Sequence, residues 1–322
     1  MSKIGQLVSN TLTTISANDL SGITSLRSGA FTKKTALTSV TLPSGITSIG
    51  GSAFSGCTGL PSITIPNSVT NIYSSAFSGC TGLTSITIPS SVTSIGDSTF
   101  YGCTNLSTAN LPNTITSIPN NTFYNCSNLA IVIPSSVTTI GDYAYYQSCL
   151  AIPNYELFIP KSVYQIGRSC FIAKMSVSGQ VCNNITSIIF EAGSTLTTIP
   201  MNCFQYQAKV TTLTLPSSLT TIGVYAFSDC SSLASITIPS AVTSIGNAAF
   251  QNTNSITEIR FLTPAGASIT LPTAGQSAGM FYRKTAKSGV IVYTDNTTIK
   301  NYAWSSDNLT CTFKHLDGTD WT

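Results

Sequence analysis

The residues of this 322-residue chain that are most able to do chemistry are its ten cysteines. Stacked at the spacing of neighbouring strands, evenly spaced cysteines would have Cα atoms roughly 4.8 Å apart, within disulfide range, but with side chains pointing the same way. No Cys-x-x-Cys pair supplies the spacing of a zinc site. We therefore expect one set to form a column of free, buried thiols that pack as small apolar groups. That set is Cys57, Cys80, Cys103 and Cys126, each 23 residues after the last. A disulfide is the alternative for a second set, which is Cys149, Cys170, Cys182 and Cys203.

Few residues in this sequence are placed to support catalysis. The single histidine, His315, lies near Asp317 and Asp320, but serine is so frequent that no particular serine is indicated as its nucleophile. The eleven carboxylates are scattered, with no pair placed for acid–base catalysis. The aspartates near the C-terminus do not follow the alternating oxygen ligands of a calcium loop. We therefore predict no enzyme activity, no metal site and no cofactor.

The composition excludes several other classes of function. Charged residues are only 8% of the chain, against a usual share of roughly 25%, and the net charge is +3. The longest basic cluster is the pair Lys33 and Lys34, so a nucleic-acid partner is not expected. No stretch approaches the 18 or so apolar residues of a transmembrane helix, so membrane insertion is not expected either. The segment from Met1 to Leu20 lacks the apolar run of a signal peptide.

An internal repeat of about 23 residues determines the expected architecture. A fixed period between 20 and 50 residues indicates a solenoid or an array. The repeat is marked by an aromatic residue in each of ten units. These positions are Phe31, Phe54, Phe77, Phe100, Phe123, Tyr145, Phe171, Phe204, Phe227 and Phe250.

One unit shows how such a coil would fold. Leu83, Ile86 and Ile88 follow the L-x-x-L-x-L pattern of a leucine-rich repeat, and the last two suit one buried face of a strand. Pro89 cannot donate to a strand ladder, so it should end that strand, and the chain should return near Phe100 toward the next unit. A single unit cannot bury its apolar face, whereas stacked units bury a continuous core. The sequence therefore predicts a mainly β, right-handed leucine-rich-repeat solenoid of about ten coils with caps at both ends.

The domain organisation follows from where the repeat holds. We expect an N-terminal cap over residues 1–19, the repeats over 20–262, and a C-terminal cap over 263–322 built from a strand, a short helix and a final strand. The aromatic spacing widens in the middle of the chain, which places insertions near residues 147–154 and 173–183.

The outward positions of the predicted strands suggest a binding surface. In most units these positions hold Ser, Thr or Asn, but three neighbouring middle units place Val132, Phe158 and Ile189 there. Four tyrosines lie close by in sequence, and these are Tyr143, Tyr146, Tyr155 and Tyr164. An aromatic, apolar patch inside a polar rim is the composition of a protein-binding hot spot. The alternative is that the inserted loops fold over these side chains and bury them.

The sequence resembles the BspA-like leucine-rich repeats, a subclass with a 23-residue unit. The resemblance is carried by the run LTSITIPSSVTSIGDSTFYGCTNL and by Ala-Phe-x-x-Cys elements such as Ala53-Phe54 with Cys57. It implies a cell-surface or extracellular adhesion module that binds a protein or glycan on a host or another cell. Similar repeats occur in viral and phage proteins, so a structural subunit of a virion or filament, or a homo-oligomer, is the alternative. The lack of a leader peptide favours that alternative.

Overall fold

The computed structural model describes residues 11–149, 152–175, 181–182, 184–272, 279–283 and 286–321. The chain divides into two compact units, residues 1–152 and 153–322, and each is described by itself. The predicted insertion near 147–154 includes residues 150 and 151, and the predicted N-terminal cap includes 1–10; these lie outside the described residues. No helix in the described ranges is long and apolar enough to cross a membrane.

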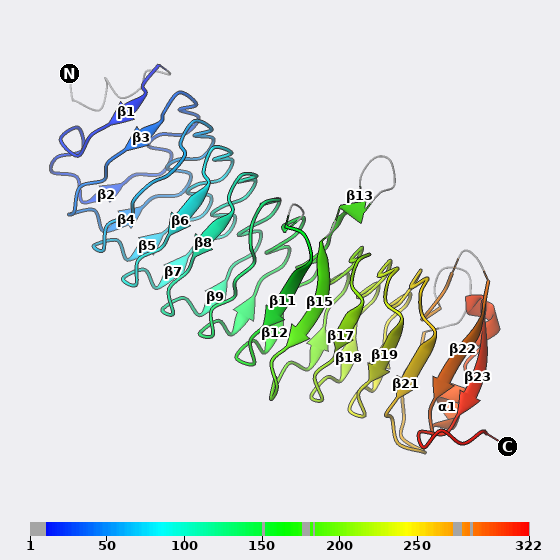
Figure 1. Ribbon diagram of the computed structural model, residues 1–322. Helices are drawn as coiled ribbons and strands as arrows, with labels where there is room; N and C mark the ends of the chain where they lie inside the picture. Colours follow the sequence, from blue (N-terminus) through cyan, green and yellow to red (C-terminus); the bar gives the residue numbers. More distant parts are fainter. Residues whose placement is uncertain are drawn as a thin grey trace. The chain divides into compact units, whose positions relative to one another are not determined.

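Unit 1 is a stack of coils whose short parallel strands lie on two sides (Figure 1). On the first side β1 pairs with β3 and β6 with β8, and on the second side β2, β4, β5 and β7 form one sheet and β9 pairs with β10. The strands are β1 (Thr14–Ile15), β2 (Ser25–Leu26), β3 (Ser39–Val40), β4 (Ser48–Ile49), β5 (Asn71–Ile72), β6 (Ser85–Thr87), β7 (Ser94–Ile95), β8 (Thr108–Asn110), β9 (Ser117–Ile118) and β10 (Thr139–Ile140).

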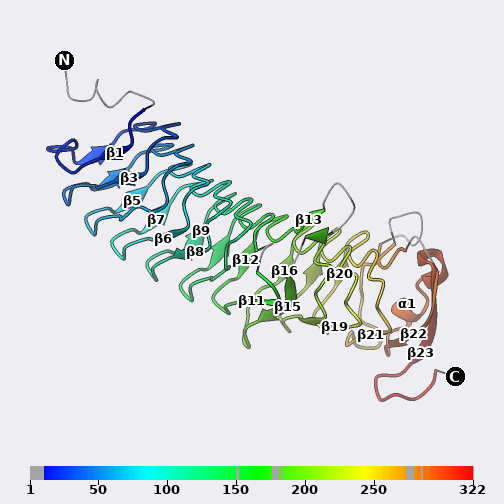
Figure 2. The ribbon, with the colours of Figure 1, turned by 45° about the horizontal axis from the view of Figure 1, so that its top comes forward.

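Unit 2 repeats this plan with longer strands on its first side (Figure 2). That side carries β11 (Tyr155–Ile159), β15 (Ile185–Phe190), β17 (Thr212–Thr214), β19 (Ser235–Ile238), β21 (Glu258–Phe261), β22 (Lys287–Tyr293) and β23 (Leu309–Lys314). The second side carries β12 (Gln165–Ile166), β16 (Thr198–Ile199), β18 (Thr221–Ile222) and β20 (Ser244–Ile245). Helix α1 (Thr297–Lys300) and the 3₁₀ helix η2 (Trp304–Asp307) lie between β22 and β23, the predicted order of strand, helix and strand. An antiparallel pair, β13 (Lys174–Met175) and β14 (Val181–Cys182), falls within the range 173–183.

The repeated aromatic residues form a buried ladder inside each unit. In unit 1 neighbouring rings from Phe31 to Tyr145 stack with centroids 5.3–5.7 Å apart. In unit 2 the rings from Phe171 to Phe250 do the same, and Phe281 adds a further ring 4.9 Å from Phe250. Such stacked pairs add stability beyond the area that they bury. The ladder therefore ties each coil to the next through its core.

The predicted fold class is confirmed. The structure is mainly β, with almost no helix, and its coils number about 12 against the ten predicted. The difference arises partly because Phe281 lies 31 residues after Phe250, so the last ring of the ladder is out of phase with the 23-residue period.

An Ile-Gly pair, such as Ile95-Gly96, recurs in most coils, and close approach between coils explains its glycine. At Gly96, a Cβ atom would lie 2.3 Å from the backbone nitrogen of Ser74 in the preceding coil. Real side chains do not approach backbone so closely, so only glycine allows this spacing there.

Candidate functional site

The outward face of the first side of unit 2 carries two of the residues predicted from sequence, Phe158 and Ile189, next to each other. The strand pairings align two rows of side chains in two separate sheets, the first formed by β11, β15 and β17 and the second by β19, β21, β22 and β23. Strands β17 and β19 are neighbours, so each row is continued from the first sheet to the second. The upper row is Phe158, Ile189, Thr214, Thr237, Arg260, Tyr293 and Lys314. The lower row is Glu156, Ser187, Thr212, Ser235, Glu258, Ile291 and Thr312.

Phe158 is the most prominent apolar side chain of this face. It is 47% exposed, while Leu157 and Ile159 on either side of it are buried, as the period of two in a strand requires. Ile189 of β15 lies directly beside it in register and is half-buried. Phe158 therefore faces outward from the coil.

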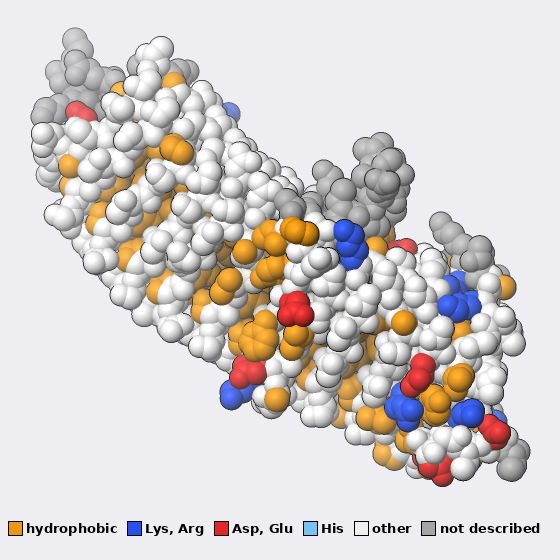
Figure 3. All heavy atoms as spheres, viewed as in Figure 1, with side chains coloured by type: hydrophobic (Ala, Val, Ile, Leu, Met, Phe, Trp, Pro, Cys, Tyr) orange, Lys and Arg blue, Asp and Glu red, His pale blue; other side chains and the backbone are white. Residues whose placement is uncertain are grey.

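The upper row changes character along the unit. After Phe158 and Ile189 come the exposed hydroxyls of Thr214 and Thr237, where a cavity of about 230 Å³ is bordered by Leu262. Charged side chains then gather over β21, β22 and β23 (Figure 3).

These charges are largely paired with one another. The guanidinium of Arg260 lies 4.1 Å from the ring centre of Tyr293 and 3.5 Å from the carboxylate of Glu258. Lys314 lies 3.6 Å from Asp320. The apolar end of the upper row is thus the part more suited to contact a partner, because the charged side chains at the other end already pair with one another.

Unit 1 holds three of the predicted residues on different parts of its coils. Val132 is 66% exposed in a stretch with no assigned strand. Tyr143 and Tyr146 lie in the turn after β10, with ring centres 5.8 Å apart and edge to face. Tyr146 also ends an external stack with Tyr124 and Tyr101, at 4.6 Å and 4.7 Å, which the sequence analysis missed. Burial, followed by the neighbouring Tyr146, raises the pKa of Tyr124.

The two remaining tyrosines of the prediction do not join the Phe158 row. Tyr155 begins β11 and is aligned with Ile185 rather than with an outward residue. Tyr164 is exposed, but it lies just before β12, which belongs to the second side of the coil. The structure therefore groups Phe158 with Ile189 in unit 2 and Tyr143 with Tyr146 in unit 1, and it places Tyr155 and Tyr164 outside the row of Phe158.

The cysteines of the predicted column are free and buried, but they do more than fill space. Each thiol donates to the carbonyl of the phenylalanine one coil earlier, at 3.1, 3.0, 3.1 and 3.0 Å for Cys57, Cys80, Cys103 and Cys126. Ser148 makes the same bond to Phe123, so a hydroxyl replaces the thiol there. Burial raises the pKa of Cys57 to about 11, which keeps this thiol protonated at neutral pH. In the second set no disulfide involves Cys149, Cys170 or Cys203, and the Cys182 side chain lies outside the described residues.

The hydrogen-bond partner of the His315 ring is distant in sequence. Its Nδ1 lies 2.8 Å from the carboxylate of Asp295, and its ring stacks on Trp321 at 4.3 Å. Among the residues that the structure describes, no group of three or more His, Cys, Asp or Glu side chains is placed to hold a metal ion.

Comparison with known proteins agrees with this geometry. A family model described as a BspA-type leucine-rich repeat region matches residues 24–153, 153–266 and 180–310. The chain belongs to the BspA-type leucine-rich repeat family. No protein with a curated description matches this family member in sequence.

Solved structures place this BspA-type protein among other leucine-rich repeat proteins. A leucine-rich repeat protein from Bacteroides ovatus is 23% identical with a TM-score of 0.53, over 94% of this chain and 84% of that chain. One from T. pallidum is 27% identical with a TM-score of 0.45, over 54% and 78%. A leucine rich cell surface protein from Faecalibacterium prausnitzii is 21% identical with a TM-score of 0.42, over 95% and 83%. The first likeness shows the fold and says nothing about a ligand.

Proposed function

We propose that this BspA-type repeat protein is a non-enzymatic binding module that recognises a protein partner at the cell surface. The observation that carries the proposal is Phe158, a half-exposed aromatic side chain in the middle of a regular strand, on a face that also carries hydroxyls and, at its other end, charges paired with one another. Membership of a repeat family of the binding and adhesion type supports it. Solenoids expose extended sheet faces that are well suited to binding.

The chemistry of the face favours an apolar anchor on the partner. Phe158 and the neighbouring Ile189 offer a small apolar contact, and the hydroxyls of Thr214 and Thr237 offer a polar rim that accepts and donates hydrogen bonds. Hot spots of interfaces combine such an aromatic anchor with a surrounding rim that excludes water. The scarcity of unpaired charge on this face predicts binding that depends little on salt.

The test is a binding screen of the full chain against purified extracellular proteins and a glycan array, repeated with two variants. Phe158→Ser removes the anchor, and Thr237→Ser is the matched control in the same row. We expect Phe158→Ser to weaken binding to a protein partner by about 30-fold, the size of a hot-spot loss of roughly 2 kcal/mol. We expect Thr237→Ser to bind like the unmodified chain.

Three outcomes would contradict the proposal. The first is equal binding by Phe158→Ser and the unmodified chain. The second is binding to glycans alone. The third is a tenfold loss of affinity between low and high salt, which would indicate that charge rather than the apolar anchor provides the affinity. A thermal melt of each variant shows that the fold is intact, because the exposed Phe158 contributes little to the core.

A further inference from the structure

The turns of the first four coils of unit 1 form an open surface that the proposed function does not use. It consists of residues 55–56 and 78–79, with Lys33 at one end and Tyr101 at the other, and we call it the turn surface. Backbone hydrogen bonds of 2.6–2.7 Å fix the order of its parts from coil to coil. In these bonds Lys33 donates to Ser55, Gly56 to Ser78, and Gly79 to Tyr101.

The middle of the turn surface carries few side-chain atoms. Gly56 and Gly79 have no side chain, and a Cβ atom on Gly79 would meet only the backbone of Gly56 within 4 Å, apart from its chain neighbours. The equivalent residue of a later coil is Asn125, which has a similar positive φ, so the backbone conformation does not by itself demand glycine. Ser55 and Ser78 border the glycines and are half-buried, and their hydroxyls can donate and accept hydrogen bonds. The middle therefore offers uncharged polar groups on an open backbone.

Tyr101 presents an aromatic face at one end of the turn surface. Its ring stacks on Tyr124 of the next coil, with centroids 4.7 Å apart, yet the residue is 40% exposed. The preceding coil carries Ser78 at the same position, and a serine side chain is too short to cover a phenol ring. The face of Tyr101 that is turned away from Tyr124 therefore remains open to a ligand.

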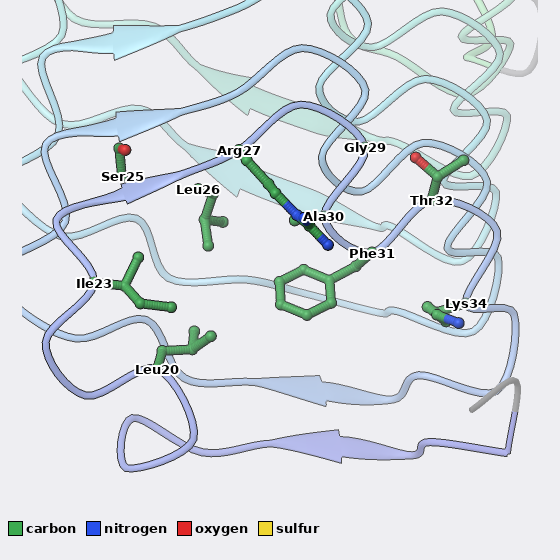
Figure 4. Close-up of a pocket in the computed structure, with 10 residues that line it drawn as sticks. All are labelled: Leu20, Ile23, Ser25, Leu26, Arg27, Gly29, Ala30, Phe31, Thr32 and Lys34. Carbon is green, nitrogen blue, oxygen red and sulfur yellow. The ribbon is translucent and has the colours of Figure 1, made fainter. Parts of the chain in front are cut away.

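Lys33 presents a cation at the other end. Thr32 and Lys34, its neighbours in sequence, lie at the turn of the first coil that is far from Ser25 (Figure 4). Lys34 is buried, whereas Lys33 is exposed. A Cβ atom on Gly56 would lie 3.4 Å from Cγ of Lys33, so the stem of this side chain lies beside the turn surface. Among the residues that the structure describes, no carboxylate pairs with Lys33, so its ammonium group is available to an anion.

We propose that the turn surface binds a glycan that ends in a carboxylated sugar, with the carboxylate at Lys33 and the neighbouring sugar ring on the open face of Tyr101. An aromatic face carries partial negative charge, so it attracts the C–H groups on the apolar face of a sugar ring. The ammonium group and the carboxylate form a charge-assisted hydrogen bond. At about 4.8 Å per coil, Lys33 and Tyr101 lie about 14 Å apart, which calls for two linked sugars rather than one. Uronates and sialates share this chemistry.

The test is an NMR titration of the full chain with digalacturonate, with sialyllactose and with neutral lactose. We expect an acidic probe to bind with a Kd of about 1 mM, which corresponds to roughly 4 kcal/mol and suits an open site with few contacts. Lactose should bind about fivefold more weakly, because it lacks the one exposed charge pair. The acidic probe that binds identifies the ligand as a uronate or a sialate.

Matched variants locate the site. Ser78→Tyr should abolish binding, because its ring would cover the open face of Tyr101 as Tyr124 covers the other face, and the coils already accept tyrosine at this position. Tyr101→Ala should weaken binding about tenfold. Tyr73→Ala is its control, since Tyr73 is an exposed tyrosine of unit 1 outside the turn surface. Lys33→Gln should weaken binding of the acidic probe about fivefold and leave that of lactose unchanged.

The proposal is overturned if neither acidic probe shows saturable binding, or if Ser78→Tyr binds the probes like the unmodified chain. Lactose binding as tight as that of the acidic probes would refute the role of Lys33. Equal losses in Tyr73→Ala and Tyr101→Ala would also overturn the proposal. A thermal melt shows which variants fold, and the exposed Lys33 keeps the site testable if Tyr101→Ala does not. Phe158→Ser should bind these probes like the unmodified chain, so this test is independent of the Phe158 surface.

Discussion

Cys103 tests whether the buried thiols are hydrogen-bond donors or only small apolar groups. Its side chain is fully buried, and its Sγ lies 3.1 Å from the carbonyl oxygen of Phe77. That carbonyl also accepts the backbone N–H of Cys80 at 3.2 Å, so the thiol is its second donor. The chain itself offers the comparison, because Ser148 donates to Phe123 at the equivalent place.

The two interpretations predict opposite orders for two substitutions. Cys103→Ala removes the donor, at about 0.5–1 kcal/mol for a weak bond, and leaves a methyl-sized cavity that costs about 1 kcal/mol. We therefore expect it to lower the free energy of unfolding by about 2 kcal/mol. Cys103→Ser keeps a donor aimed at the same carbonyl, and we expect it to cost about 1 kcal/mol or less.

Urea denaturation followed by circular dichroism measures both variants against the unmodified chain. An apolar thiol would be replaced better by alanine than by serine, since serine would bury a hydroxyl without need. A Cys103→Ala variant more stable than Cys103→Ser would thus refute the donor role. Equal slopes of free energy against urea for all three chains would show that the comparison is between like transitions.

Three further predictions follow from the coil. Phe100→Ala should lower the free energy of unfolding, measured by urea denaturation, by about 3–5 kcal/mol. Phe31→Ala should lower it by at least about 0.5 kcal/mol less, because Phe31 ends the ladder and has one stacked neighbour in it, whereas Phe100 has two. Equal losses for the two variants would contradict a stabilising role of the ladder. The raised pKa of Cys57, about 11 against 9.0, means that its contribution to stability is complete below pH 9 and is lost as the pH rises toward 11. Melts between pH 8 and 11 would support this if the difference between Cys57→Ser and the unmodified chain is constant below pH 9 and changes only above it, and a difference that stays constant up to pH 11 would contradict it. Gly96→Ala should lower the melting temperature, since its Cβ would meet the Ser74 nitrogen, whereas an unchanged melt would mean that the coils can separate there.

The coil itself could be predicted from the sequence because each position in it repeats. The period of the aromatic residues, the alternation at Ile86 and Ile88 and the stop at Pro89 all reflect local rules, and the structure buries both isoleucines. Phe281 could not be placed this way, because the residues between it and Phe250 do not keep the period.

The surface could be predicted only in part. Phe158 and Ile189 were found because they interrupt a repeated polar position, and the strand register brings them together. Tyr164 was grouped with them wrongly, because closeness in sequence does not say on which side of a coil a residue lies. The stack of Tyr101 and Tyr124 had a signal that was missed, namely tyrosine directly after the ladder phenylalanine in successive coils. The Asp295 partner of His315 had none, since it lies 20 residues away across a strand pair.

The most direct measurement of the central claim is hydroxyl-radical footprinting of the full chain with and without the protein partner from the binding screen. Phe158 and Tyr73 are similarly exposed in the free protein, at 47% and 53%, and Tyr73 belongs to unit 1, whereas the proposed face belongs to unit 2. The account predicts that the partner lowers the oxidation of Phe158 several-fold and leaves that of Tyr73 unchanged. Undiminished oxidation of Phe158 in the saturated complex would contradict it.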